Sequence, residues 1–226
     1  MIEYTHQYYE RYFHENYNGP LRRGCGAEEC LAWASRSFQA GRWLDVGAGP
    51  CSFFWASAAP AETSSITLSD RSMTPLEITR ALVRRREWPA AYQEAVRLLN
   101  KSARHLDALC EVPISVLAFD AFSEWPPLSP FHSISAFGLL GLASSSDEVS
   151  AFLFNAKRAL AKDGMLFGAS WIFRPSYAKR LGDRKQHLTV LPKILSDTGF
   201  GEISLSRIPL PFEQDYAEIV LFRGRR

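Results

Sequence analysis

The sequence has few cysteines, no long apolar run and no excess of charge of one sign. Its four cysteines form no CxxC pair and no zinc-type spacing, which predicts reduced thiols and no metal site. No apolar run approaches the roughly 20 residues of a membrane span, and the first residues lack the layout of a signal peptide. The 26 basic and 24 acidic residues leave a net charge of +2, which disfavours nucleic acid or a membrane as the main partner. We therefore expect a cytoplasmic protein.

The composition is that of an ordinary globular chain, with 46% hydrophobic and 22% charged residues. Apolar runs that predict strands alternate with segments of helical periodicity. We expect strands at 43–46, 65–68, 114–118, 131–137, 165–170, 201–207 and 217–222. We expect helices at 4–16, 27–38, 51–58, 75–86, 90–110, 147–161 and 191–198. This alternation predicts a Rossmann-like, doubly wound α/β sheet of seven strands, mostly parallel, with an antiparallel hairpin at the C-terminus.

The segment LDVGAGP at 44–50 is the most informative part of the chain. It predicts a strand that ends in a tight turn, where Gly47 and Gly49 let a ligand approach the backbone, and a helix that begins near Pro50. Asp45 is expected to point into the crevice at the carboxyl end of this strand. A carboxylate there suits an ammonium group and repels a pyrophosphate, and the third glycine of a dinucleotide motif is missing.

Two further acids end the next two predicted strands. Asp70 lies 21 residues after Gly49, where an acid can accept hydrogen bonds from a ribose diol, although a turn or helix-cap role is equally compatible with its position. Asp120, in LAFDAF, suits an adenine amino group. Three acids at successive strand ends beside a glycine turn describe a nucleoside with an amino-acid tail and no phosphate. We therefore predict that the cofactor is S-adenosylmethionine.

These motifs also carry a resemblance. DVGAGP, followed by SDRS and FDAF, resembles the motif series of class I S-adenosylmethionine-dependent methyltransferases. Together with YYERYF at 8–13 and the segment 176–192, the chain is similar to nicotinamide and phenylethanolamine N-methyltransferases and thioether S-methyltransferases. The resemblance implies an N-terminal helical lid at 1–40 over a methyltransferase-like domain at 41–226.

The resemblance also implies roles for individual residues. The expected cofactor contacts are Tyr8, Phe13, Asp45, Gly47, Gly49, Asp70, Asp120, Ala121 and Phe137. The substrate side is expected to comprise Tyr12, Gly138, Ser170 and Tyr177, with Tyr177 and Phe137 nearest the reacting atoms. Cys51 and the scattered histidines are more simply explained as packed or solvated residues than as catalytic ones.

The chain departs from its amine-methylating relatives on the substrate side. Where they carry carboxylates, the matching positions here are Gly141 and Ser170, and the segment 137–142 is apolar. This disfavours a cationic amine and favours a small-molecule metabolite with a neutral nitrogen or thiol, in specialised metabolism. Two alternatives remain at this stage. One is a cyclase that forms azetidine-2-carboxylate and methylthioadenosine from the cofactor, and the other is a cofactor-binding protein without turnover.

Overall fold

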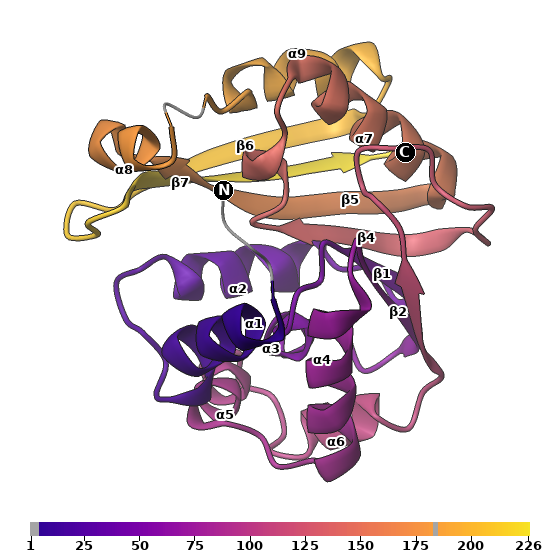
Figure 1. Ribbon diagram of the computed structural model, residues 1–226. Helices are drawn as coiled ribbons and strands as arrows, with labels where there is room; N and C mark the ends of the chain where they lie inside the picture. The colour runs from indigo at the N-terminus through magenta and orange to yellow at the C-terminus, as the bar shows by residue number, and fades with distance from the viewer. Residues whose placement is uncertain (1–4, 183–184) are drawn as a thin grey trace.

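A seven-stranded sheet forms the centre of the computed structural model, which describes residues 5–182 and 185–226 (Figure 1). Its order is β3-β2-β1-β4-β5-β7-β6, in which β7 pairs antiparallel with both β5 and β6 and the other pairs are parallel. The strands are β1 Gly41–Val46, β2 Thr63–Asp70, β3 Ile114–Ala118, β4 Phe131–Phe137, β5 Leu160–Phe173, β6 Gly201–Pro209 and β7 Tyr216–Arg225. The predicted fold class is therefore confirmed.

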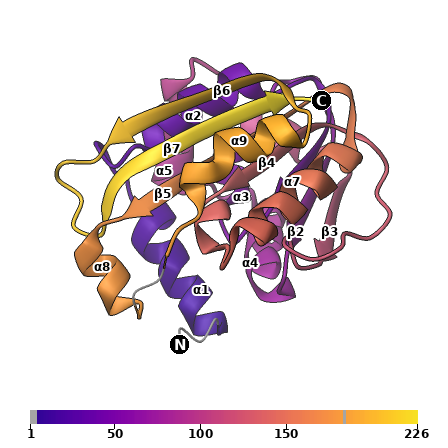
Figure 2. The same ribbon diagram turned by 90° about the horizontal axis from the view of Figure 1, so that it is seen from above.

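Helices cover both faces of the sheet, as Figures 1 and 2 show. One face carries α2 Ala27–Ser37, α3 Ser52–Ala56, α4 Met73–Arg85, α5 Ala90–Leu98 and α6 His105–Leu109. The other carries α7 Ser146–Ala159 and α9 Leu191–Asp197. Three short helices, η2 Leu140–Leu142, α8 Pro175–Arg180 and η3 Leu188–Val190, complete the connections. Within the described ranges, no helix combines the length and the apolar character that crossing a membrane requires.

The N-terminal segment forms α1 His6–Phe13, which continues into the π-helical turn η1 His14–Asn18. Figure 2 shows α1 at the same end of the molecule as α8 and α4. The next helix, α2, packs directly on the sheet, because the Trp33 indole Nε1 donates a 3.0 Å hydrogen bond to the Phe222 carbonyl of β7. The segment that lies over the end of the sheet is therefore α1 with η1.

Two predicted elements differ in detail, and α8 is an addition to them. The helix expected at 90–110 is divided, because Asn100 adopts a left-handed φ of +53° between α5 and α6. The residues between the helix expected at 147–161 and the strand expected at 165–170 lie within β5 as an irregularity, where Asp163 has a φ of +62° and the pairing with β4 shifts register. Helix α8 was not predicted, although Pro175 begins it at a position that suits proline.

Candidate active site

The turn after β1 is joined directly to the end of β2. Gly47 and Gly49 have positive φ values of +67° and +54°. The Gly49 amide donates a 3.1 Å hydrogen bond to Asp70 Oδ2, and the Ala48 amide donates one of 2.8 Å to the Ser69 carbonyl. A Cβ atom on Gly49 would meet nothing within 4 Å, whereas one on Gly47 would lie 2.8 Å from Leu139 Cδ1. Open space therefore adjoins the backbone at Gly49, where a bound ligand would need it.

Asp70 performs the turn role that its sequence position allowed. Besides the bond from Gly49, its Oδ1 accepts a 3.2 Å hydrogen bond from the Ser72 amide at the start of α4. Burial raises the pKa of Asp70, and the hydrogen bonds from the Ser72 and Gly49 amides oppose that rise. Each carboxylate oxygen has a further lone pair, so the turn role is compatible with the predicted ribose contact.

Asp45 does not point into an open crevice as expected. It is 1% exposed, on the face of β1 that also carries Trp43 and packs on α3. Its Oδ2 accepts a 2.5 Å hydrogen bond from Ser52 Oγ, and its Oδ1 accepts one of 2.6 Å from Ser135 Oγ. Burial raises the pKa of Asp45 to about 6, while these two hydrogen bonds lower it. The structure thus corrects the expectation, because Asp45 supports the turn from within the protein.

The third predicted acid, Asp120, is exposed in the turn after β3. Its Oδ1 accepts a 2.9 Å hydrogen bond from the Phe122 amide, which fixes the turn. The Phe119 amide donates a 3.0 Å bond to the Asp70 carbonyl, so this turn begins beside the end of β2. The neighbouring Ala121 is buried. The structure therefore brings the segments of Asp70 and Asp120 together, and their contacts with a nucleoside stay a prediction.

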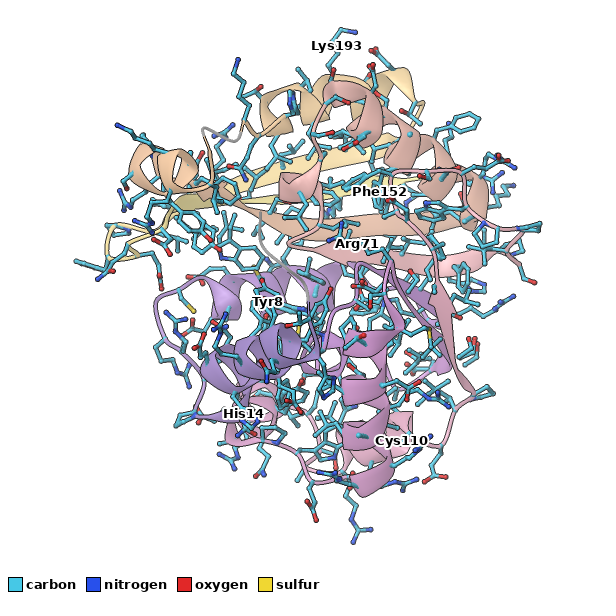
Figure 3. All side chains as sticks on the ribbon, viewed as in Figure 1. Tyr8, His14, Arg71, Cys110, Phe152 and Lys193 are labelled. Atoms are coloured by element: carbon cyan, nitrogen blue, oxygen red, sulfur yellow. The ribbon has the colours of Figure 1, made fainter. Side chains whose placement is uncertain are left out.

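Helix α1, which the sequence predicts to be part of a lid, is capped at its start and packs against α5 at its end. Thr5 Oγ1 accepts a 3.2 Å hydrogen bond from the Tyr8 amide at its start. Phe13, near its end, is buried, with its ring centroid 6.5 Å from that of Tyr92 on α5. Between them, Tyr8 and Tyr12 stack at 6.3 Å with an interplanar angle of 15°. Figure 3 marks Tyr8 on α1, where its side chain is half-buried, whereas Phe13 belongs to the core.

Phe137, at the end of β4, forms an aromatic wall with Trp55 of α3. Their ring centroids are 4.1 Å apart with an interplanar angle of 11°. Gly138 follows with a φ of +75°, and a Cβ there would meet only the Trp171 ring, at 4.0 Å. The backbone after Phe137 is therefore open as well as close to aromatic surface.

Tyr177 of α8 lies in a second aromatic group, at the end of β5. Its ring is 5.2 Å from Phe173 and 5.6 Å from Tyr216, and the Arg180 guanidinium lies 5.0 Å from its centroid. The Tyr216 ring also packs against Phe173, with centroids 6.1 Å apart. Burial raises the pKa of Tyr216, so that its hydroxyl remains protonated. Tyr216 thereby joins β7 to α8.

Gly141 and Ser170, which stand where amine-methylating relatives carry carboxylates, have different surroundings in the structure. Ser170 is fully buried, faces the α7 side with Leu166 and Ile172, and its hydroxyl has no partner among the described residues. It lies on the opposite face of β5 from Ala169 and Trp171, which belong to the core on the α2 side. A Cβ on Gly141 would lie 2.9 Å from Gln186 Nε2. Gln186 fills that space with an amide.

Sequence reasoning missed Trp55, Gln186 and Tyr216. Tyr216 pairs with Phe173 across β5 and β7, so the register of the C-terminal strands was the signal that could have found it. Trp55 follows the glycine turn by one and a half helical turns, on the side of α3 that meets β4. Gln186 lies between α8 and η3, and no local pattern marks it.

The sequence matches no protein-family model and no curated protein. Solved methyltransferase structures share its fold. N-methyltransferase NodS from Bradyrhizobium japonicum WM9, in complex with S-adenosyl-L-homocysteine, has a TM-score of 0.61 at 15% identity over 99% of both chains. Phosphoethanolamine N-methyltransferase 2 from Haemonchus contortus has a TM-score of 0.66 at 15% identity, over 99% of this chain and 58% of that one. The S-adenosylmethionine-dependent methyltransferase SibL has a TM-score of 0.54 at 17% identity, over 83% of this chain and 51% of that one.

Proposed function

We propose that this protein binds S-adenosylmethionine at the carboxyl ends of β1, β2 and β3 and directs methyl transfer to a small-molecule acceptor. The observation that supports this proposal most strongly is the 3.1 Å hydrogen bond from the Gly49 amide to Asp70. It places a turn without side chains beside a carboxylate that can accept hydrogen bonds from a ribose diol. The fold shared with methyltransferases crystallised with S-adenosylmethionine or S-adenosylhomocysteine supports this proposal.

The cofactor supplies a methyl group activated by a positive sulfonium. Asp70 would bind the ribose while it continues to hold the Gly49 and Ser72 amides. Asp45 would act on the cofactor only through the turn that it supports. The other contacts that we propose come from Tyr8, Phe13, Gly47, Asp120, Ala121 and Phe137.

Methyl transfer is an in-line displacement, so the protein must mainly align donor and acceptor and exclude water. The Phe137 ring, held flat by Trp55, offers an aromatic face to positive charge. Each good contact of this kind is worth roughly 0.5–2 kcal/mol. We place Tyr12, Gly138 and Tyr177 on the acceptor side. Ser170 faces the α7 side of β5, so its proposed contact with the acceptor would have to be made from that face.

The acceptor is proposed to be uncharged. The segments 137–145 and 170–182, which follow β4 and end β5, contain no Asp or Glu. An ammonium group buried there would lack a counter-charge, which costs several kcal/mol. A neutral nitrogen or a thiol reacts through its own lone pair and needs no carboxylate. We propose a metabolite of this class, in specialised metabolism.

The test is to incubate the protein with S-adenosylmethionine, alone and with 2-mercaptoethanol as a probe acceptor, and to identify the nucleoside by mass spectrometry. Adenosylhomocysteine with methylated thiol supports the proposal. Asp70→Asn, which keeps a carbonyl oxygen for one backbone amide, should reduce its formation. If no nucleoside forms with any of a panel of neutral nitrogen and thiol acceptors, the protein binds the cofactor without turnover.

The same assay decides the cyclase alternative, which the absence of an acceptor carboxylate in 137–145 and 170–182 favours. In that reaction the α-amine of the cofactor attacks its own γ-carbon, the carbon–sulfur bond breaks, and the amine releases a proton to solvent. The products are azetidine-2-carboxylate and methylthioadenosine. Methylthioadenosine and azetidine-2-carboxylate formed from the cofactor in the presence of the protein, and not in its absence, would therefore establish cyclisation in place of methyl transfer.

A further inference from the structure

The side-chain amide of Gln186 continues the hydrogen bonding of β5 beyond the end of β4. The pairing of β4 with β5 ends where Phe137 lies opposite Ala169. Farther along β5, the Trp171 carbonyl accepts a 2.8 Å hydrogen bond from Gln186 Nε2, and the Phe173 amide donates one of 2.7 Å to Gln186 Oε1. One carboxamide thus takes the place of a neighbouring strand's peptide group and satisfies two main-chain groups that β4 does not reach.

Gly141 of η2 leaves the room that this amide occupies. It is buried, and a Cβ there would lie 2.9 Å from Gln186 Nε2 and 3.6 Å from the Trp171 carbonyl oxygen. The φ of Gly141 is not positive, so its backbone conformation is open to other residues. The close approach of the Gln186 amide, and not the backbone conformation, therefore requires glycine at this position.

The two residues that Gln186 holds border the proposed acceptor side. The Trp171 ring lies 4.0 Å from the position that a Cβ would take on Gly138. The Phe173 ring lies 5.2 Å from that of Tyr177, and α8 begins two residues after Phe173. The place of Tyr177 therefore depends on the main chain at Phe173, which Gln186 holds.

We infer that Gln186 is a positioning residue for the acceptor side of the site. Its amide, admitted by Gly141, fixes the end of β5 and through Phe173 places Tyr177. This inference rests on the proposed methyl transfer, and it assigns Gln186 no contact with the reacting atoms. Cofactor affinity should not depend on Gln186, because neither residue to which it is hydrogen-bonded is a proposed cofactor contact.

The first readout is hydrogen exchange at the Phe173 amide, resolved by nuclear magnetic resonance. Gln186→Met fills a similar volume without hydrogen bonds. It should speed this exchange about fivefold, the factor that corresponds to one lost hydrogen bond of about 1 kcal/mol. Gly141→Ala should have the same effect, because the new Cβ displaces the amide. The double variant should add little to either single substitution, because both remove the same interaction.

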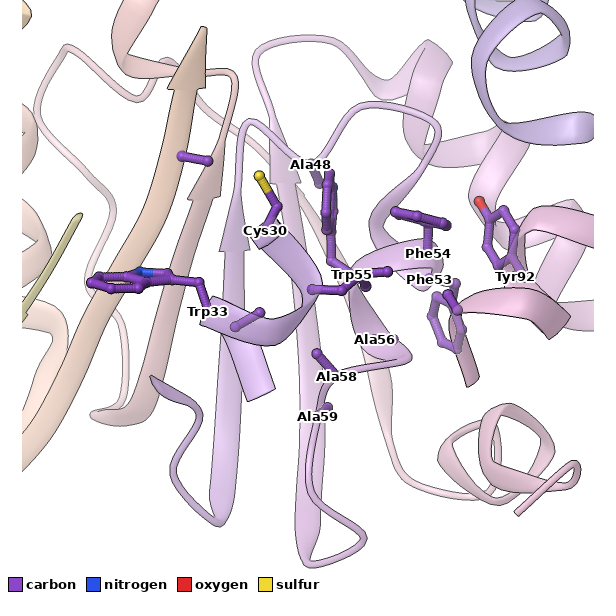
Figure 4. Packing of buried hydrophobic residues seen from close by; sticks show 14 of the residues in the cluster. Cys30, Trp33, Ala48, Phe53, Phe54, Trp55, Ala56, Ala58, Ala59 and Tyr92 are labelled. Carbon is purple, nitrogen blue, oxygen red and sulfur yellow. The ribbon is translucent and has the colours of Figure 1, made fainter. Parts of the chain in front are cut away.

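The chain offers a matched control for each substitution. Gln93 of α5 also donates its side-chain amide to a tryptophan carbonyl, that of Trp88 at 2.9 Å. Figure 4 shows its neighbour Tyr92 packed beside Phe54, on the face of the sheet that carries α3 and α5. At Gly201 of β6, a Cβ would meet nothing closer than 4.0 Å. Gln93→Met and Gly201→Ala should leave the exchange at the end of β5 unchanged.

The second readout separates turnover from cofactor binding. With 2-mercaptoethanol as the acceptor, Gln186→Met should lower kcat/KM about fivefold. The dissociation constant of S-adenosylhomocysteine should keep its parent value. In a Tyr177→Ala background, the same substitution should cause no further loss of kcat/KM, because Gln186 acts through that side chain.

Unchanged exchange at Phe173 in Gln186→Met, or faster exchange with parental turnover, would overturn the inference. Equal losses of turnover and of affinity for S-adenosylhomocysteine would also overturn it, since they indicate a general structural effect. A parent protein that forms no adenosylhomocysteine with any acceptor would instead refute the proposed function. The exchange rates would then still decide whether Gln186 holds the end of β5.

Discussion

Replacing Asp45 by asparagine should remove a specific pH dependence from the stability of the fold. The Asp45 carboxyl is 1% exposed, and burial raises its pKa from 3.8 to about 6. In the unfolded chain the same carboxyl ionises near its ordinary value. Between these two values the folded state binds more protons than the unfolded state, so this group's contribution to stability falls as the pH rises from roughly 4 to 6.

The magnitude follows from the difference of about two pH units between the folded and unfolded pKa values. At 1.36 kcal/mol per unit, Asp45 should reduce the free energy of unfolding by about 3 kcal/mol between pH 4 and pH 7. The new amide can keep its neighbours satisfied. Ser52 Oγ already lies 3.2 Å from the Ala48 carbonyl, to which it can donate while it accepts from the amide. Ser135 can still donate to the amide oxygen.

Urea unfolding of both proteins at several pH values between 4 and 7.5 measures this effect. The difference in free energy between parent and Asp45→Asn should move by about 3 kcal/mol in favour of the variant as the pH rises. Other carboxyl groups contribute equally to both proteins and cancel. A difference that stays constant with pH, or that moves in favour of the parent, would refute the reasoning that burial is the main influence on the pKa of Asp45.

Three other predictions concern the lid and the acceptor side. Hydrogen exchange should slow across 6–18 when S-adenosylmethionine is added, and identical exchange would make this segment a plain structural helix. Phenylethanolamine, an ammonium ion at neutral pH, and nicotinamide, whose methylated product is a pyridinium cation, should not be methylated, because Gly141 and Ser170 provide no counter-charge, and efficient methylation of either would contradict this. Tyr177→Ala should lower turnover more than cofactor affinity, whereas Phe212→Ala, at a side chain 93% exposed, should change neither. Parental turnover in Tyr177→Ala would remove that residue from the site.

The glycine turn and the sheet could be predicted from sequence because both depend on local patterns. An apolar run that ends in GAG requires a tight turn, and the spacing from Gly49 to Asp70 follows from one strand–helix–strand unit. The direction of the Asp45 side chain could not be predicted in this way. Residues 43–46 of β1 are buried on both faces, so no alternation of polar and apolar residues reveals which face meets α3.

The contacts between distant segments also could not be predicted from the sequence. Tyr216 joins Tyr177 only through the antiparallel pairing of β7 with β5. Tyr17 packs against Phe54 because α1 continues as a π-helical turn, which no periodicity in 14–18 indicates. Gln186 occupies the space beside Gly141 from a loop far along the chain. Each of these depends on tertiary packing and not on local propensity.

Calorimetric titration with S-adenosylmethionine tests the central claim most directly. The parent protein should bind one equivalent. Asp70→Asn should bind about 10- to 150-fold more weakly, which corresponds to about 1.5–3 kcal/mol for a hydrogen-bonded charged group. The circular dichroism spectrum of the variant should match that of the parent, which shows that the overall fold is retained. Absence of binding to the parent, or an unchanged dissociation constant in a folded Asp70→Asn, would contradict the account.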